Sequence, residues 1–340
     1  MKKYFISAML SALLFLTGCS AESSPEPVQG TFFAMDTMMD FTIYGESGLI
    51  NQSESLIASL ESLVSVTDAD SELYAINQTG SGMLTEEASS LMKQALEICR
   101  RTDGALDLSI YPIVRAWGFT TGSYQVPDEA EIQALLPLVD YRKIQYDAAT
   151  GTVTVTLPEG MEIDLGSVAK GYAGQLAAQM LREHGVQSAL LNLGGNVQTV
   201  GAKPDGSPWQ IGIKDPQGED AMMVLSVEDQ AVVTSGGYER YFEQDGQTYW
   251  HIMDPSTGHP ADSGLISVTI VGDEGVVCDG LSTALFVMGL EKAADLWAQS
   301  GDFEAVFVTA SGEVYITEGL RDHFALTERY ADTPVSVIER

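Results

Sequence analysis

The sequence has few basic residues. Its 340 residues include 17 Lys and Arg against 48 Asp and Glu, which gives a formal net charge of −31, and no run of Lys or Arg exceeds two residues. Proteins that bind nucleic acids neutralise the phosphates with a basic patch. The composition therefore excludes ordinary recognition of DNA or RNA.

The sequence also lacks a hydrophobic run long enough to span a membrane. Its N-terminal apolar run, Tyr4 to Leu16, has 13 residues, whereas a spanning helix needs about 20. The run follows Lys2-Lys3 and ends in Leu16-Thr17-Gly18-Cys19, small residues before a cysteine that resemble a bacterial lipobox. We expect residues 1–18 to be a signal peptide and Cys19 to be lipidated, which would anchor the chain extracytoplasmically to the bacterial cell membrane. An ordinary secretory signal that happens to contain a cysteine is the alternative.

Cysteine is scarce beyond this site. Cys99 and Cys278 are the other two, and both fall in apolar stretches of helical appearance without metal-ligand spacing. We predict two buried free thiols rather than a disulfide. Residues 19–29, rich in Ser, Pro and Glu, are predicted to be a tether, and residues 30–340 to form a single folded unit of one or two subdomains. With 45% hydrophobic residues, this domain should fold.

Helical and strand patterns alternate through the domain. Helices are predicted at 50–66, 86–101, 128–136, 167–184 and 279–300. Strands are predicted within 31–44, at 143–146 and 152–157 as a hairpin, and at 163–166, 188–193, 209–214, 231–234, 248–253, 265–271, 305–309 and 313–316. Because hairpins are frequent among these elements, we predict an α+β fold with mixed or antiparallel sheets and packed helices.

The first cluster of polar residues is Asp164-Leu-Gly166-Ser167 with Lys170. We expect Asp164 to close a short strand and Ser167 to cap the following helix, whose N-terminal amides favour an anion. Lys170 would lie in the first helical turn, where a cation opposes the helix dipole, so its position suggests a bound phosphate or carboxylate. A capped helix with a solvated lysine is the alternative interpretation.

A second cluster pairs Asp279 with Thr283 at the predicted start of a helix. Residues four apart share a helix face, so the carboxylate and the hydroxyl can reach one hard cation. Oxygen ligands of this kind suit Mg²⁺. In isolation, an aspartate at a helix start is more often a cap.

The third cluster runs from Thr234 to Phe242 and continues at His251, beside the turn Asp254-Pro-Ser-Thr-Gly258. Imidazole titrates near neutral pH, so His251 is the best candidate for a general base, although a lone histidine at a strand end is often structural. Leu193-Gly-Gly-Asn196 is predicted to be a tight turn. The sequence contains no Gly-x-Ser-x-Gly elbow, Walker motif or Cys-x-x-Cys.

Together these stretches resemble one family, the ApbE-type FAD:protein FMN transferases. The matching stretches, in family order, are Met35-Asp-Thr37, Asp70-Ser-Glu-Leu with Asn77, Thr102-Asp-Gly-Ala-Leu-Asp107 with Trp117-Gly-Phe119, Asp164-Leu-Gly166 with Ala169-Lys-Gly-Tyr172, Asn192-Leu-Gly-Gly-Asn196, Thr234-Ser-Gly with Tyr238-Glu-Arg-Tyr, His251-Ile-Met-Asp-Pro with Thr257-Gly258, and Asp279 to Thr283 with Met288-Gly289. They cover most of the domain.

The resemblance implies an α+β flavin-binding core and a set of site residues. FAD would contact Met35, Ala105, Leu106, Asp107, Asp164, Lys170 and Ile252. Mg²⁺ would be bound by Ser167, through its carbonyl, Asp279 and Thr283. His251 would activate the acceptor hydroxyl. The chain departs from the usual pattern at several positions, with Thr67 where many members have a tyrosine beside the flavin, Asp36 for glycine, Leu106 for phenylalanine, Gly237 for aspartate or asparagine, and Ser282 where some members have a further metal-binding aspartate.

The implied reaction moves FMN from FAD onto a Thr or Ser hydroxyl of an extracytoplasmic partner protein and releases AMP. That partner would be a subunit of a membrane redox complex or a secreted flavoprotein. Two alternatives stay open. One is a pyrophosphatase that splits FAD to FMN and AMP with water, and the other is a tethered lipoprotein that binds flavin or another solute without turnover.

Overall fold

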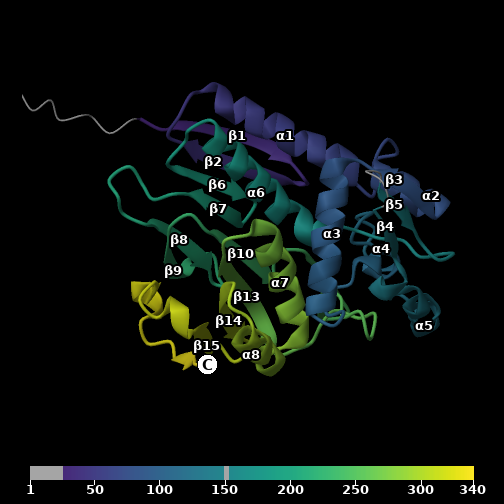
Figure 1. Cartoon of the computed structure of the whole chain (residues 1–340). Helices are drawn as coiled ribbons and strands as arrows, with labels where there is room; N and C mark the ends of the chain where they lie inside the picture. Colours follow the sequence, from purple (N-terminus) through teal and green to yellow (C-terminus); the bar gives the residue numbers. More distant parts are fainter. Residues whose placement is uncertain (1–25, 149–152) are drawn as a thin grey trace, which may run out of the picture.

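The computed structural model describes residues 26–148 and 153–340, and a nine-stranded sheet forms its centre (Figure 1). The strand order is β1-β2-β6-β7-β10-β13-β14-β15-β17, and all neighbours are antiparallel except the parallel pair β15–β17. The strands are β1 (Val28–Ala34), β2 (Thr37–Ile43), β6 (Ala189–Leu193), β7 (Asn196–Val200), β10 (Ala231–Gly236), β13 (Leu265–Gly272), β14 (Phe303–Thr309), β15 (Val314–Thr317) and β17 (Val335–Ile338). The predicted α+β class with mixed and antiparallel sheets is confirmed.

Helices cover one face of this sheet and a small second sheet covers the other. The helices are α1 (Gly48–Val64), α3 (Glu86–Arg101), α6 (Gly166–Glu183), α7 (Gly275–Met288) and α8 (Leu290–Gln299). The second sheet has the order β16-β9-β8 and is built from β8 (Trp209–Lys214), β9 (Ala221–Val227) and β16 (Phe324–Leu326). Alternate residues of the central strands serve the two faces, so Val233 belongs to the core under the helices and Val232 to the core under the second sheet.

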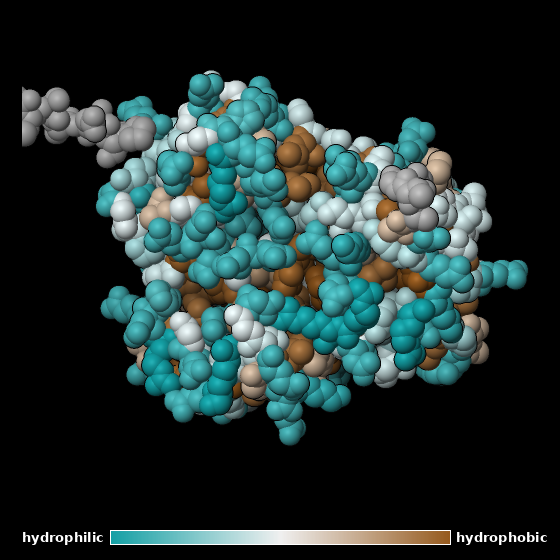
Figure 2. All heavy atoms as spheres, in the orientation of Figure 1, coloured by the Kyte–Doolittle hydropathy of each residue, from teal (hydrophilic) through white to brown (hydrophobic). Residues whose placement is uncertain are grey.

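A smaller unit lies beside α3 (Figure 1). It contains α2 (Glu72–Thr79), α4 (Tyr111–Ala116), α5 (Glu129–Leu135) and a three-stranded sheet of β3 (Ser81–Leu84), β4 (Gln145–Asp147) and β5 (Val153–Thr156). A separate hairpin, β11 (Tyr241–Gln244) with β12 (Gln247–Trp250), packs Phe242 and Tyr249 onto the buried ring of Trp117. The surface over all of this is largely hydrophilic on the face drawn in Figure 2.

Most predicted elements are present, but several boundaries were wrong. The helix 86–101 and the hairpin of 143–157 are confirmed. No strand forms at 163–166, because the backbone of Ile163 bonds the side-chain amide of Asn77 in both directions, at 2.8 Å each. The helix predicted at 279–300 begins at Gly275 and breaks at Gly289, whose φ is +78°. The first strand begins at Val28, two residues inside the predicted tether.

The predicted signal peptide and the lipidation site Cys19 lie outside the described residues. Among the residues that are described, no helix is both long and apolar enough to cross a membrane. Cys99 and Cys278 are buried free thiols, as predicted. Burial raises the pKa of Cys99 to about 12, so this thiol is unreactive at neutral pH.

Candidate active site

The site is built where two helices, α6 and α7, cross at their N-terminal ends. The backbones approach closely because both helices have glycine at the crossing. A Cβ added to Gly171 would lie 2.1 Å from the carbonyl oxygen of Gly275, and one added to Gly275 would lie 2.4 Å from that of Gly171. Any side chain at either position would therefore force the helices apart.

This crossing places Asp279 of α7 against the first turns of α6. The aspartate is only 5% exposed, and its Oδ2 accepts a hydrogen bond from the backbone N–H of Gly171 at 2.8 Å. Burial raises its pKa, while Lys170, the Gly171 amide and Asn196 act in the opposite direction. The sequence prediction put Asp279 at the start of its helix. It lies instead one turn inside α7, so the alternative role as an N-cap is wrong.

The oxygen atoms around Asp279 are suited to a hard cation. In a regular α-helix the N–H of Gly171 donates to the carbonyl of Ser167. Here the same N–H also donates to Asp279, so the Asp279 carboxylate and the Ser167 carbonyl share one donor. Thr283, one turn further along α7, has its hydroxyl 3.3 Å from the hydroxyl of Ser235 in β10. Ser282, by contrast, donates to the carbonyl of Asp279 and does not take the place of a second carboxylate.

Within residues 26–148 and 153–340, no group of three or more His, Cys, Asp or Glu side chains forms a metal-binding cluster. A metal at Asp279 would thus be held by one carboxylate together with hydroxyl, carbonyl, water and phosphate oxygens. This donor set fits Mg²⁺, which keeps several waters and commonly binds through one or two carboxylates plus substrate phosphates.

Asp164 lies where α6 begins. Its Oδ1 accepts from the N–H of Gly166 at 2.8 Å, so Asp164, not Ser167, satisfies the first amide of the helix. Ser167 is the second residue of α6, and the prediction that it caps the helix was wrong. Burial raises the pKa of Asp164, and the Arg240 guanidinium counteracts this. The Arg240 guanidinium itself donates to the carbonyl of Phe119 at 2.8 Å.

Lys170 begins the second turn of α6 rather than lying in the first. Its ammonium group is the main charge that lowers the pKa values of Asp279 and Glu239, and it also acts on His251. Lys170 thus acts electrostatically on both carboxylates and on the imidazole.

His251 follows β12 and is held at the base of the hairpin. Its backbone N–H and its Nδ1 both bond the carbonyl of Arg240, at 3.1 and 3.2 Å. Because Nδ1 must donate to a carbonyl, the neutral ring presents Nε2 as its basic nitrogen. Burial, followed by the charge of Arg240, lowers the pKa of His251 to about 4. The ring is therefore neutral and able to accept a proton at physiological pH.

Met35 lies in the turn between β1 and β2, at the end of the sheet that also carries the turn of Gly194 and Gly195 between β6 and β7. Met35 and Asp36 both have positive φ, 49° and 58°, a conformation that glycine adopts more easily than aspartate. Thr37 packs on the next hairpin turn, where a Cβ on Gly194 would lie 2.0 Å from its hydroxyl oxygen. Gly194 and Gly195 have positive φ, which confirms the tight turn predicted before Asn196.

The segment with Ala105, Leu106 and Asp107 connects α3 to the short helix η1 (Leu108–Ile110). Asp107 is buried, and its two oxygens accept from Ser109 and from the backbone N–H of Tyr141. Leu106 is also buried, whereas Ala105 is partly exposed. Ile252 is buried beside His251. These residues stay predicted FAD contacts, and the structure gives Asp107 and Leu106 a role in packing as well.

The arrangement resembles known proteins throughout. Residues 35–307 match the ApbE family. The chain belongs to the ApbE family. An FAD:protein FMN transferase of Klebsiella pneumoniae (strain 342) is 35% identical over 285 residues, which cover 82% of this chain and 88% of that protein. The crystal structure of an ApbE protein from Thermotoga maritima has a TM-score of 0.82 at 32% identity, covering 88% of this chain and 99% of that one. The flavin transferase ApbE from Vibrio cholerae has a TM-score of 0.78 at 27% identity and covers the same shares.

In this ApbE family chain, four polar residues at the site were not singled out for a role from the sequence. Ser235 bonds Ser282 and Thr283. Against the effect of burial, Asn196 acts to lower the pKa of Asp279, Arg240 that of Asp164, and Lys170 that of Glu239. Ser235, Glu239 and Arg240 belong to the Thr234 to Phe242 stretch, which is the sequence signal that could have pointed to them. The sequence could not predict that this stretch lies near α6 and α7, because that depends on the tertiary fold.

Proposed function

We propose that the protein is a Mg²⁺-dependent FAD:protein FMN transferase. It would transfer FMN from FAD to a Thr or Ser hydroxyl of an extracytoplasmic acceptor protein and release AMP. The observation that carries the proposal is the hydrogen bond of Asp279 with the Gly171 amide at the crossing of α6 and α7, with Thr283 one turn further along α7 and the charge of Lys170 acting on both Asp279 and His251. The proposed reaction would use Asp279 and Thr283 to bind the metal, Lys170 as a cation and His251 as a neutral base.

The reaction forms a bond between the acceptor oxygen and the phosphorus of the FMN part. It breaks the bond from this phosphorus to the oxygen that leaves with AMP. Negative charge develops on the phosphate oxygens as this happens, and stabilising that charge is the main catalytic task. Mg²⁺ bound at Asp279 and Thr283 would supply Lewis-acid stabilisation of the pyrophosphate.

The chain's own groups contribute the remaining charge and orientation. Lys170 brings an ammonium group to the same space, and the positive end of the α6 dipole would add to the attraction for a phosphate. The chain carries 48 acidic side chains against 17 basic ones, so it offers an anionic substrate no general attraction. Local cations therefore matter more here than they would on a basic protein.

His251 would accept the proton of the acceptor hydroxyl through Nε2. Its Nδ1 is engaged by the Arg240 carbonyl, which fixes both the ring orientation and the tautomer. General-base assistance of this kind is worth about 10²–10⁴-fold in rate. Met35, Ala105, Leu106, Asp107, Asp164 and Ile252 are proposed to contact FAD.

The proposed setting is the outer side of the cell membrane. Cleavage before Cys19 would remove Lys2 and Lys3 and leave a lipid anchor on Cys19, followed by the short tether that ends at β1. The acceptor would be a membrane redox subunit or a secreted flavoprotein. Mass spectrometry of the mature protein from a bacterial membrane tests this placement, and an unmodified Cys19 would contradict it.

The activity is tested by incubating the mature domain with FAD, Mg²⁺ and an FMN-acceptor domain, followed by a denaturing gel. Flavin fluorescence in the acceptor band is expected, and it should disappear when the target Thr or Ser is replaced by Ala. AMP release at the same rate without any acceptor would favour FAD hydrolysis instead. Stoichiometric FAD binding in Mg²⁺ without AMP formation would identify a flavin-binding lipoprotein.

A further inference from the structure

A cavity of about 470 Å³ lies between α3 and the segment from Tyr141 to Tyr146. Its size falls within the range of small-molecule sites in proteins. It is lined by none of the residues assigned above to the metal, the base or FAD. The cavity thus lies outside the candidate active site and has no role in the proposed reaction.

Three cations line this cavity: Lys93 and Arg100, two turns apart on α3, and Arg142 opposite them. Among the described residues, no acidic one lines it. In a chain with a net charge of −31, a cavity lined by three cations, of which two pair with neighbouring carboxylates, is a local reversal of charge. Such a lining attracts anions that the rest of the surface repels.

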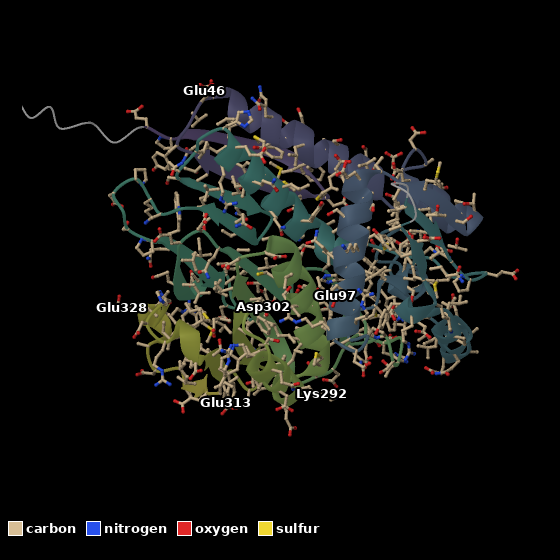
Figure 3. All side chains as sticks on the ribbon, viewed as in Figure 1. Glu46, Glu97, Lys292, Asp302, Glu313 and Glu328 are labelled. Atoms are coloured by element: carbon tan, nitrogen blue, oxygen red, sulfur yellow. The ribbon has the colours of Figure 1, made fainter. Side chains whose placement is uncertain are left out.

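The acidic neighbours of these cations lie outside the cavity and hold them weakly. Arg100 pairs with Glu97, which is labelled on α3 in Figure 3, and Arg142 donates through Nε to Asp140 at 2.7 Å. Exposed pairs of this kind contribute little and are readily exchanged for a better-placed anion. Lys93 takes part in none of the ion pairs within residues 26–148 and 153–340.

The rest of the lining is aromatic and apolar. It consists of Tyr141 and Tyr146 with the buried side chains of Leu96 and Ile144. The hydroxyl of Tyr146 lies 3.0 Å from that of Ser89, which fixes this ring, and the backbone N–H of Tyr141 donates to Asp107 at 2.9 Å, which fixes the main chain there. The wall is thus largely formed before any ligand arrives, which lowers the entropic cost of binding.

We propose that this cavity binds an organic phosphate that carries a planar ring. The three cations would contact the phosphate, and the ring would pack on the tyrosines and the apolar floor. Either part alone would bind poorly, because a free phosphate leaves the apolar wall uncovered and a neutral ring leaves the cations without a partner. The structure therefore assigns a second ligand site to the chain, independent of FMN transfer.

The test is isothermal titration of the mature protein, without Mg²⁺ or FAD, using phenyl phosphate, inorganic phosphate and phenol as probes. Phenyl phosphate should bind at least about tenfold more tightly than either fragment. AMP is titrated next to distinguish a nucleotide site from a general site for ring phosphates. Tighter binding of AMP than of phenyl phosphate would indicate a nucleotide site, and equal binding would indicate a site for ring phosphates in general. Absence of saturable phenyl phosphate binding would overturn the proposal.

Variants locate the binding. The double substitution Lys93→Gln with Arg142→Gln should weaken phenyl phosphate at least about tenfold. A matched control, Lys292→Gln with Arg321→Gln, removes two exposed cations elsewhere, the first labelled on α8 in Figure 3, and should leave the affinity unchanged. Lys170→Gln should also leave it unchanged. Loss of binding in Lys170→Gln with full binding in the cavity variant would place the ligand in the candidate active site and refute the proposal.

Discussion

The Oδ2 atom of Asp279 accepts a hydrogen bond from the backbone N–H of Gly171 at 2.8 Å, across the crossing of α6 and α7. This bond joins a carboxylate proposed to bind metal to the helix whose N-terminus is proposed to meet the phosphates. It exists because both helices carry glycine where they touch. Gly171 and Gly275, by allowing the two helix backbones to touch, therefore position the charged groups of the site.

Replacing Gly171 with Ala should disrupt the site and destabilise the fold. The new Cβ would lie 2.1 Å from the carbonyl oxygen of Gly275, which rigid helix backbones cannot tolerate without moving. Overpacking of this kind costs about 1–3 kcal/mol. Urea denaturation should show the loss, and FMN transfer should fall with it. Gly48→Ala, at the start of α1, is the control without a clash, since a Cβ there would come no closer than 4.0 Å to its nearest neighbour, Nε2 of Gln52.

Replacing Asp279 with Ala should abolish turnover while the chain still folds. The change removes the only buried carboxylate proposed for Mg²⁺ together with the hydrogen bond that it accepts from the Gly171 amide, at a cost of about 1–3 kcal/mol. We expect the thermal midpoint to fall modestly and AMP release to vanish. The stabilisation of the wild type by Mg²⁺ with FAD, measured in the same thermal scan, should also disappear. Normal Mg²⁺-dependent turnover in this variant would refute the metal assignment.

The pH dependence of turnover should reflect the lowered pKa of His251. With a pKa of about 4 in the folded protein, the imidazole is neutral and able to act as a base throughout the range from pH 5 to 8. The acidic limb of kcat/KM should therefore fall well below pH 6.5, and His251→Ala should lose turnover at every pH. An acidic limb centred near 6.5 would contradict the environment described for this ring.

The same shift affects stability in a defined direction. An unfolded histidine titrates near 6.5, so between pH 6.5 and about 4 the unfolded chain binds the proton more readily than the folded one. His251 therefore makes the free energy of unfolding decrease as the pH falls through this window. Comparing urea denaturation of wild type and His251→Gln at pH 7 and pH 5 should show a smaller decrease in the variant. Equal decreases would contradict this contribution.

Asp107 should matter for the fold as well as for FAD. Its carboxylate accepts from Ser109 and from the amide of Tyr141, so Asp107→Asn would turn one acceptor into a donor that faces another donor. We expect a loss of about 1–3 kcal/mol in denaturation experiments and weaker FAD binding. Asp103→Asn, at an exposed position of left-handed backbone that asparagine tolerates, is the matched control. Equal effects of the two changes would remove the special role of Asp107.

Local signals in the sequence predicted much of this structure. The helix 86–101 has acidic residues in its first turn, basic ones in its last and Gly104 beyond it, and its boundaries are correct. The strand predicted at 163–166 failed because the side chain of Asn77, far away in the sequence, satisfies that backbone. Short elements such as α2 and α4 were missed, since one or two helical turns leave little periodicity to detect.

The candidate site was predictable as a set of residues but not as a geometry. The family resemblance pointed to Asp279, Thr283 and His251, and helical spacing alone put the first two on one face. The contact of Asp279 with Gly171, and the proximity of Glu239 and Arg240, depend on which helices and hairpins the fold brings together. Pair contacts between distant segments leave no local pattern in one sequence.

The most direct test of the central claim is the ratio of AMP released to flavin bound covalently. The mature domain would be incubated with FAD, Mg²⁺ and an acceptor protein, and both products would be quantified from the same samples over time. The proposed transferase predicts one AMP for each flavin attached, with neither product formed when the acceptor's target hydroxyl is removed. AMP release in excess of attached flavin, unaffected by loss of that hydroxyl, would contradict it.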